Sequence, residues 1–195
     1  MQVKITVEGD KAFERKLNSL ATKQLPFAIA QSLTKTAKQA QVGATRQIQK
    51  DIDRPTPFTK KAVGIEIAKR NKPYALVFIK RKQAEYLKYQ VYGGQRKARK
   101  GKAVLIPSRQ TKKNQYGNLP KGKVNRLLRK NKAFKQGRLF VEVQRGDITR
   151  GLAYSAAEAN YKPILRFHDR VEQVAKTVFP LIMVRSLLYA IKTAR

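Results

Sequence analysis

The first part of the chain alternates between apolar and polar residues and then changes to a helical spacing. Residues 1–7 alternate apolar and polar side chains, which is typical of a short strand. Phe13, Leu17 and Leu20 then recur on one helical side, and Asp10 stands where an N-cap is expected. We therefore predict a strand followed by a first helix.

Two longer helices are predicted from the same spacing. One follows Pro26 and ends near Ile52, and its apolar positions form a narrow stripe of mostly small residues: Ile29, Leu33, Ala37, Ala40, Ala44 and Ile48. The other lies at the C-terminus, where we expect an interruption or kink near Pro180. Its apolar positions are Val171, Val174, Val178, Leu181, Ile182, Leu188 and Ile191.

Strand patterns occupy the middle of the chain. The two prolines of residues 54–59 must end the preceding helix, after which residues 63–67 and 74–79 alternate as two strands of a β-hairpin. Further strands are expected at residues 103–107, 139–143 and 164–167, and one or two helical turns at residues 124–128. The aromatic stretch 85–92 fits either a strand or a short helix, because its periodicity does not distinguish them.

This order of elements predicts the α+β class. We expect long N-terminal helices, a small antiparallel β-sheet or sandwich, and a C-terminal helix, all in one domain spanning residues 1–195. A basic, loop-rich insertion is expected at about residues 94–138. Within it, residues 110–123 are rich in Asn, Gly and Lys and lack apolar periodicity, as in an extended loop.

The net charge of the chain indicates what kind of partner it binds. The chain has 44 Lys and Arg residues against 12 Asp and Glu residues, a formal net charge of +32. The mutual repulsion of so many positive charges destabilises the compact fold unless anions neutralise them. A polyanionic partner is therefore expected. Between Tyr86 and Val141 there is no acidic residue at all, while seventeen cations accumulate.

We define the basic tract as the cations of this acid-free segment that are expected to contact DNA phosphates. Lys and Arg displace counterions from phosphates, and the absence of a recognition helix favours sequence-independent backbone contacts over base reading. The candidate residues are Arg96, Lys97, Arg99, Lys100, Lys102, Lys112, Lys113, Lys121, Lys123, Arg126, Arg129, Lys130, Lys132, Lys135 and Arg138. The alternative interpretation is a solvated loop without a ligand.

Tyrosines beside these cations suggest a second mode of contact. Tyr86, Tyr89, Tyr92 and Tyr116 are close in sequence to basic residues, and such aromatics can stack on the bases of a single strand. Their apolar neighbours favour a role in the core or at an interface instead.

Residues for enzyme chemistry are scarce. The chain has no cysteine, which excludes disulfides and thiol nucleophiles, and its single histidine excludes multi-histidine metal sites. His168 and Asp169 are adjacent and would point apart in a strand, while Asp51 and Asp53 are poorly spaced for sharing a metal on a helix. We therefore expect a non-enzymatic protein with no catalytic residue, metal or cofactor.

Membrane insertion and secretion are not expected. The most apolar run, residues 178–184, contains Pro180 and is far shorter than the roughly 20 residues of a membrane span, so it is interpreted as a buried helix. No membrane anchor is predicted. The N-terminus also lacks the long apolar stretch of a secretory signal.

Residues 25–37 (LPFAIAQSLTKTA), continued by residues 44–48 (ATRQI), resemble the early helix of prophage minor tail protein Z. A proline opens an alanine-rich helix with a small-residue pattern and a basic continuation. Thr34 and Lys35 replace the Asn-Arg-like pair of that family. The remaining order of elements resembles the wider group of tail-completion proteins, including an aromatic strand at residues 86–93 and a closing helix introduced by Phe179 and Pro180.

The resemblance implies a virion protein at the head-proximal end of a long non-contractile phage tail. Its expected partners are other copies in a homo-oligomeric ring, the neighbouring head-tail connector, tail terminator or tail tube proteins, and DNA. The protein is expected in the host cytoplasm before assembly. Two alternatives follow from composition: a ribosomal-type nucleic-acid-binding protein, which would bind as a monomer, and a nuclease, which would cleave DNA with a divalent metal.

Overall fold

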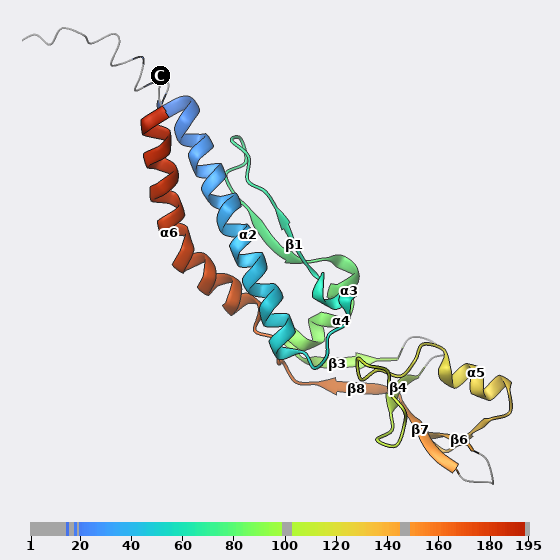
Figure 1. Cartoon of the computed structure of the whole chain (residues 1–195). Coiled ribbons are helices and arrows are strands. Elements are labelled where there is room, and N and C mark those ends of the chain that lie inside the picture. The colour runs from blue at the N-terminus through green and yellow to red at the C-terminus, as the bar shows by residue number, and fades with distance from the viewer. Residues whose placement is uncertain (1–14, 16–17, 19, 99–102, 145–148, 194–195) are drawn as a thin grey trace, which may run out of the picture. The chain divides into compact units, whose positions relative to one another are not determined.

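The computed structural model describes residues 15, 18, 20–98, 103–144 and 149–193. The strand predicted at residues 1–7 and the positions of Asp10, Phe13 and Leu17 lie outside these residues. The chain forms two compact units, which are described separately (Figure 1). The helical unit comprises Met1–Arg46, Ala62–Lys80 and Phe167–Arg195, and the basic unit comprises Gln47–Lys61 and Arg81–Arg166. Helices and antiparallel sheets coexist, so the α+β prediction is confirmed.

Two long antiparallel helices form the helical unit. After the π-helical turn η1 (Leu20–Gln24), α2 (Leu25–Asp51) follows the predicted stripe of small residues closely. α6 (Phe167–Thr193) lies beside it: Gly43 of α2 lies so close to Val174 that an added Cβ would be 2.8 Å from Cγ2. At the other end, Gln24 Nε2 donates to the Thr193 carbonyl at 3.3 Å. Small residues on α2 permit this close approach.

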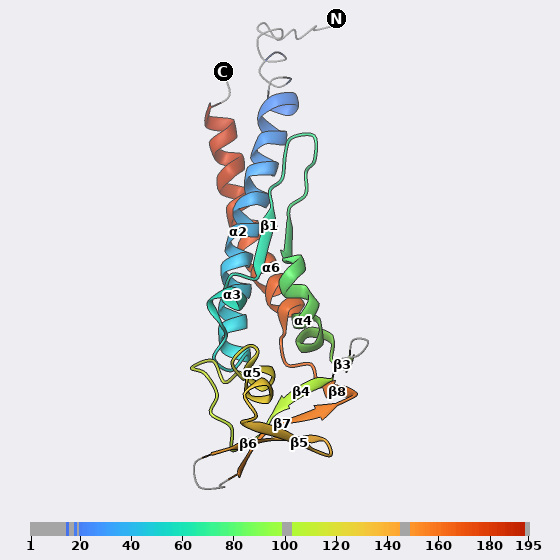
Figure 2. The same ribbon diagram turned by 90° about the vertical axis from the view of Figure 1, so that its right-hand side faces the viewer.

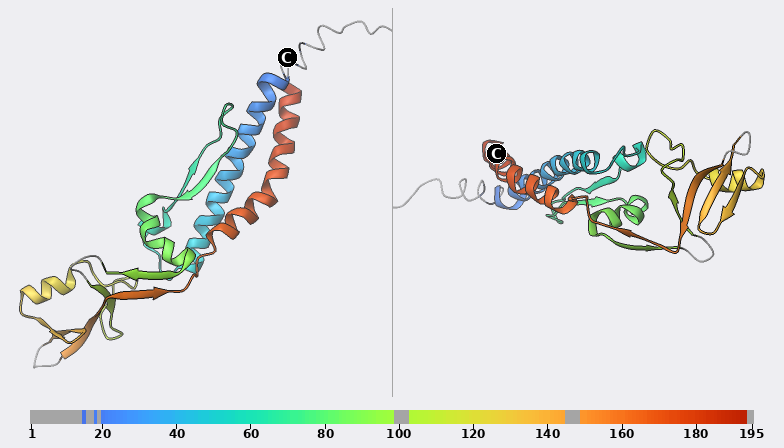
Figure 3. Two further views of the ribbon diagram at one scale, coloured as in Figure 1. Left: turned by 180° about the vertical axis from the view of Figure 1, so that it is seen from behind. Right: turned by 90° about the horizontal axis from the view of Figure 1, so that it is seen from below.

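The predicted hairpin is confirmed. β1 (Val63–Glu66) and β2 (Leu76–Ile79) pair antiparallel, with Ile65 opposite Val77. Gln41 Nε2 donates to the Val63 carbonyl at 3.0 Å, which ties the hairpin to α2. Within the helical unit, α2 therefore lies between α6 and the hairpin, as opposite views show (Figures 1 and 3).

α6 agrees with only part of its prediction. Of the interruption or kink expected near Pro180 there is no interruption, since the helix continues through Pro180, while its ribbon bends along its length (Figure 1). Residues 178–184 were predicted to be buried, and this is wrong, since Leu181 and Val184 are largely exposed. By length and composition alone α6 could also cross a membrane; mostly buried core helices of soluble proteins pass the same test, whereas only 11% of the apolar window of α6 is buried.

The basic unit contains two antiparallel sheets and three short helices, α3 (Pro57–Lys60), α4 (Arg81–Tyr92) and α5 (Lys123–Arg129) (Figure 2). One sheet pairs β3 (Gly94–Lys97) with β8 (Glu158–Tyr161). The other has the order β4-β7-β6-β5, formed by β4 (Val104–Pro107), β5 (Ala133–Gln136), β6 (Leu139–Val143) and β7 (Thr149–Ala156). The strands predicted at residues 103–107 and 139–143 and the helical turns at residues 124–128 are confirmed.

The stretch 85–92, for which the pattern left a strand and a short helix open, belongs to the helix α4, with Gln83 and Leu87 at i and i+4 both buried on one face. The aromatic strand that the resemblance implied at residues 86–93 is therefore wrong. Residues 164–167 are not a strand either: the amides of Ile164 and Leu165 both donate to the Gln90 carbonyl at 2.8 Å. The last strand is β8, just before this segment.

Candidate nucleic-acid interface

α5 is fixed by its apolar side on the four-stranded sheet. Val124 is buried with Ala133, Leu152 and Ala153, and Leu127 and Leu128 of α5 pack against this cluster. Three-residue spacing places Arg126 and Arg129 together on the exposed side. The hydrophobic cluster therefore presents these two guanidinium groups on a rigid support.

An ion cluster attaches the start of α5 to β6 and β7. The Glu142 carboxylate lies 3.4 Å from Lys123 Nζ and 3.0 Å from Arg150 Nη2, and all three side chains are at most 22% exposed. Burial alone would raise the pKa of Glu142. The hydrogen bond from Arg150 and the charge of Lys123 outweigh burial, so the pKa of Glu142 lies below its usual value.

The loop between β4 and α5 is held by hydrogen bonds at its base. The Thr111 hydroxyl donates to the carbonyl of Gly151 at 3.0 Å and also contacts that of Leu152. The Gly151 amide donates to Gln110 Oε1 at 3.0 Å. Ser108, whose amide donates to the Leu152 carbonyl at 3.2 Å, completes this attachment. The base of the predicted extended loop is therefore attached to β7.

The tip of this loop is organised around Asn114. Its Oδ1 accepts from the amides of Tyr116 and Asn118 at 3.0 and 2.9 Å. Gly117 has a φ of +74° and lies against the guanidinium of Arg54, which itself pairs with Asp53 at 2.8 Å. This pairing lowers the pKa of Asp53, first through the hydrogen bond from Arg54.

Most of the basic tract is exposed. Arg99, Lys100 and Lys102 lie outside the described residues, and Lys123 is partly buried in the ion cluster. Among the described residues of the tract, Lys123 is also the one that pairs with a carboxylate within 4 Å. The exposed members are Arg96, Lys97, Lys112, Lys113, Lys121, Arg126, Arg129, Lys130, Lys132, Lys135 and Arg138.

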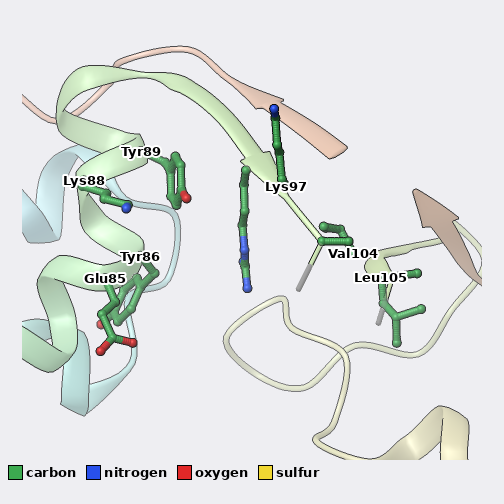
Figure 4. A pocket seen from close by; sticks show the side chains of 10 residues that line it. Glu85, Tyr86, Lys88, Tyr89, Lys97, Val104 and Leu105 are labelled. Atoms are coloured by element: carbon green, nitrogen blue, oxygen red, sulfur yellow. The ribbon is translucent and has the colours of Figure 1, made fainter. Parts of the chain in front are cut away.

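A pocket in the basic unit brings two tract residues together with aromatic rings. It has a volume of about 770 Å³ and is lined by residues of α4, β3 and β4, among them Arg96 and Lys97 (Figure 4). Lys88, Tyr86 and Tyr89 line it from α4. Lys88 belongs to the acid-free segment but was not among the candidate residues, and the fold of α4 places it in the lining of this pocket with Arg96 and Lys97.

Two of the four tyrosines, Tyr86 and Tyr89, have structural partners. The Tyr86 hydroxyl hydrogen-bonds with Thr59 Oγ1 at 3.0 Å, and the Tyr89 ring lies 5.5 Å from that of Tyr161. Lys88 Nζ lies 5.0 Å from the centre of the Tyr89 ring. The base-stacking hypothesis remains a prediction, and the observed contacts assign these rings to packing between α4 and its neighbours.

The two carboxylates considered as metal ligands, Asp51 and Asp53, each bind different protein groups. Asp51 accepts from Gln47 Nε2 at 2.9 Å and from the Arg166 amide at 3.3 Å, whereas Asp53 pairs with Arg54. Over residues 20–98, 103–144 and 149–193, no three acidic or histidine side chains form a group that could hold a metal ion.

Comparisons with known proteins identify the family. Neither the curated proteins nor the solved structures give a significant match to the chain. The model of the prophage minor tail protein Z family matches residues 7–148, which include α2, the hairpin and the whole basic tract. The chain therefore belongs to the prophage minor tail protein Z family and is a structural protein of the bacteriophage virion tail.

Proposed function

We propose that the protein is a subunit of the phage neck that joins the tail to the head and contacts DNA without sequence preference. Copies form a ring beside connector, tail terminator or tail tube proteins, and the basic tract lies on the side that meets the DNA. The observation that carries this proposal is the set of exposed cations on α5 and the adjoining loop and strands that, within the described part of the tract, have no carboxylate within 4 Å.

Electrostatics supports this arrangement of copies. A closed ring of subunits that each carry +32 charges repels itself strongly unless an anion lies against the cations. DNA within the ring offsets that repulsion. A ribosomal-type monomer, the alternative from composition, has the same charge but is disfavoured by membership of a tail protein family.

The salt dependence of duplex DNA binding tests the contact. Each phosphate that a cation neutralises contributes about −0.9 to the slope of log K against log salt. Replacing Arg126, Arg129 and Lys130 by Gln should flatten the slope by up to about 2.7, since each removes one phosphate contact. Lys123 is left intact because it stabilises the fold through Glu142.

A matched control removes the same charge elsewhere. Lys35, Lys38 and Arg46 are exposed cations of α2 in the helical unit, and their replacement by Gln should leave the slope nearly unchanged. Equal flattening in both triple variants would mean that net charge, rather than the basic tract, binds DNA. If neither variant changes the slope, the tract faces protein. A density map of the mature particle would then locate it.

A further inference from the structure

The outer face of α6 is apolar and uncovered. Four residues at spacings of three, four and three form one narrow stripe along the helix, and each is 55–63% exposed. Residues exposed to this extent seldom form a contiguous apolar patch on a soluble protein unless the patch is a contact site. We define this outer α6 face as Leu181, Val184, Leu188 and Ile191.

The opposite side of α6 packs against the rest of the helical unit. Ser186 and Ala190 are buried, Val174 fits against Gly43, and Thr193 is hydrogen-bonded to Gln24. A helix that left this position to enter a bilayer would uncover the small residues of α2. Only one side of α6 is therefore available to a partner.

The hairpin offers a second apolar face. Leu76 and Phe78 alternate with the more buried Val77 and Ile79, and Tyr74 continues the exposed row. We define the outer hairpin face as Tyr74, Leu76 and Phe78, which are 42–47% exposed. Because Val77 and Ile79 are more buried than Leu76 and Phe78, the outer hairpin face is the side of the hairpin that is turned away from the rest of the helical unit.

The two faces match in length. Ten residue steps of helix from Leu181 to Ile191 cover about 15 Å, and four residue steps of extended chain from Tyr74 to Phe78 cover about 13 Å. Glu66 stands opposite Leu76 in the hairpin register, but its carboxylate is paired with Lys72 at 2.6 Å and is already neutralised within the hairpin. The match between the two faces is therefore one of length and apolar character.

We propose that the outer α6 face of one copy packs on the outer hairpin face of the next copy, head to tail around the ring. This inference rests on the proposed ring and names the surfaces that build it. Pairing α6 with α6 across a two-fold axis would leave the hairpin face uncovered in both copies. Head-to-tail contact covers both faces in every copy of a closed ring, using a single type of interface.

The available area is sufficient. Taking roughly 170 Å² for each large side chain, the exposed fractions of the seven residues supply roughly 650 Å² of apolar surface per contact. The smallest stable interfaces bury about 1,200 Å² in total, a little more than half of it apolar. The two faces therefore supply about the apolar area that one such interface needs.

Cysteine cross-linking tests the contact directly, because the chain has no cysteine of its own. Full-length chains carrying either Leu188→Cys or Phe78→Cys are mixed and oxidised, both as purified protein and in purified tails. The mixture should give a covalent dimer, and a chain carrying both changes should give a ladder that ends at the ring size. Glu172→Cys, on an exposed part of α6 off the stripe, is the matched control and should not cross-link to Phe78→Cys.

Each other outcome overturns the proposal. Cross-linking of Leu188→Cys with itself or with Val184→Cys would show that α6 pairs with α6. Sedimentation of the protein with phosphatidylcholine vesicles, lost in Leu188→Lys, would show that the face binds lipid. Absence of the mixed cross-link in both purified protein and tails would also refute the contact. If the mixed cross-link is absent but the protein still binds duplex DNA, the contact between copies is refuted and the proposed DNA contact is not.

Discussion

Replacing Glu142 by Gln is the sharpest test of how the basic unit is held together. Glu142 is the carboxylate that neutralises both Lys123 at the start of α5 and Arg150 on β7. Glutamine keeps the size of the side chain and removes its charge. Two mostly covered cations then face each other without a counterion.

The expected cost follows from distance and burial. At separations of 3.0 and 3.4 Å, each attraction is several kcal/mol for an effective dielectric constant of about 20, and desolvation cancels much of it. Removing one partner of a fully buried pair costs about 3–5 kcal/mol. Because the three side chains are still 13–22% exposed and the pair is not fully buried, we expect a smaller loss of about 2–3 kcal/mol in the free energy of unfolding.

Thermal unfolding followed by circular dichroism measures this loss. For a chain of this size, the change corresponds to a fall in Tm of roughly 5–10 °C. Glu172→Gln is the matched control, since Glu172 forms an exposed i, i+4 pair with Lys176 that contributes little to stability. If Glu142→Gln is as stable as Glu172→Gln, the ion cluster does not stabilise the unit and the reasoning is wrong.

Three further predictions concern pH and packing. The folded pKa of Glu142 is below its usual value of 4.5, so the contribution of Glu142 to stability is complete above pH 4.5 and is lost as the pH falls through the folded pKa. The free energy of unfolding measured in urea should therefore decrease over that pH range in the wild type but not in Glu142→Gln. Gly43→Ala places Cβ 2.8 Å from Val174 and should destabilise the protein by about 1 kcal/mol, a loss that Val174→Ala should partly relieve in a double-mutant cycle. Leu152→Ala should cost about 2–5 kcal/mol in chemical denaturation, whereas Tyr154→Ala, at an exposed position, should cost much less; equal losses would contradict the assigned core.

Local sequence was enough to predict α2, the hairpin and the basic tract. The stripe from Ile29 to Ile48 sustains helical spacing over many turns, so the long helix is specified by near neighbours alone. Prolines 55 and 57 mark its end, and the alternating residues that follow predict β1 and β2. The charge of the tract needs no fold to be recognised, since it depends only on composition.

Tertiary contacts decided the short and ambiguous segments. Residues 85–92 carry too few apolar positions to distinguish a strand from a helix, and the joint burial of Gln83 and Leu87 settles them as α4. The segment 164–167 has the composition of a strand, but its amides reach Gln90 instead of a neighbouring strand. Strand pairing depends on a partner that the local pattern cannot show.

The availability of individual side chains is also a tertiary property. Sequence alone treated Lys123 as equivalent to Arg126, whereas the fold brings Glu142 and Arg150 to Lys123 and leaves Arg126 exposed. The apolar residues of α6 predicted a buried helix, but one face of α2 can cover only one side of it, which leaves Leu188 uncovered. The sequence by itself determined the two long helices and how much positive charge the chain carries. Only the packing of distant segments decided which of those side chains remain free to meet a partner.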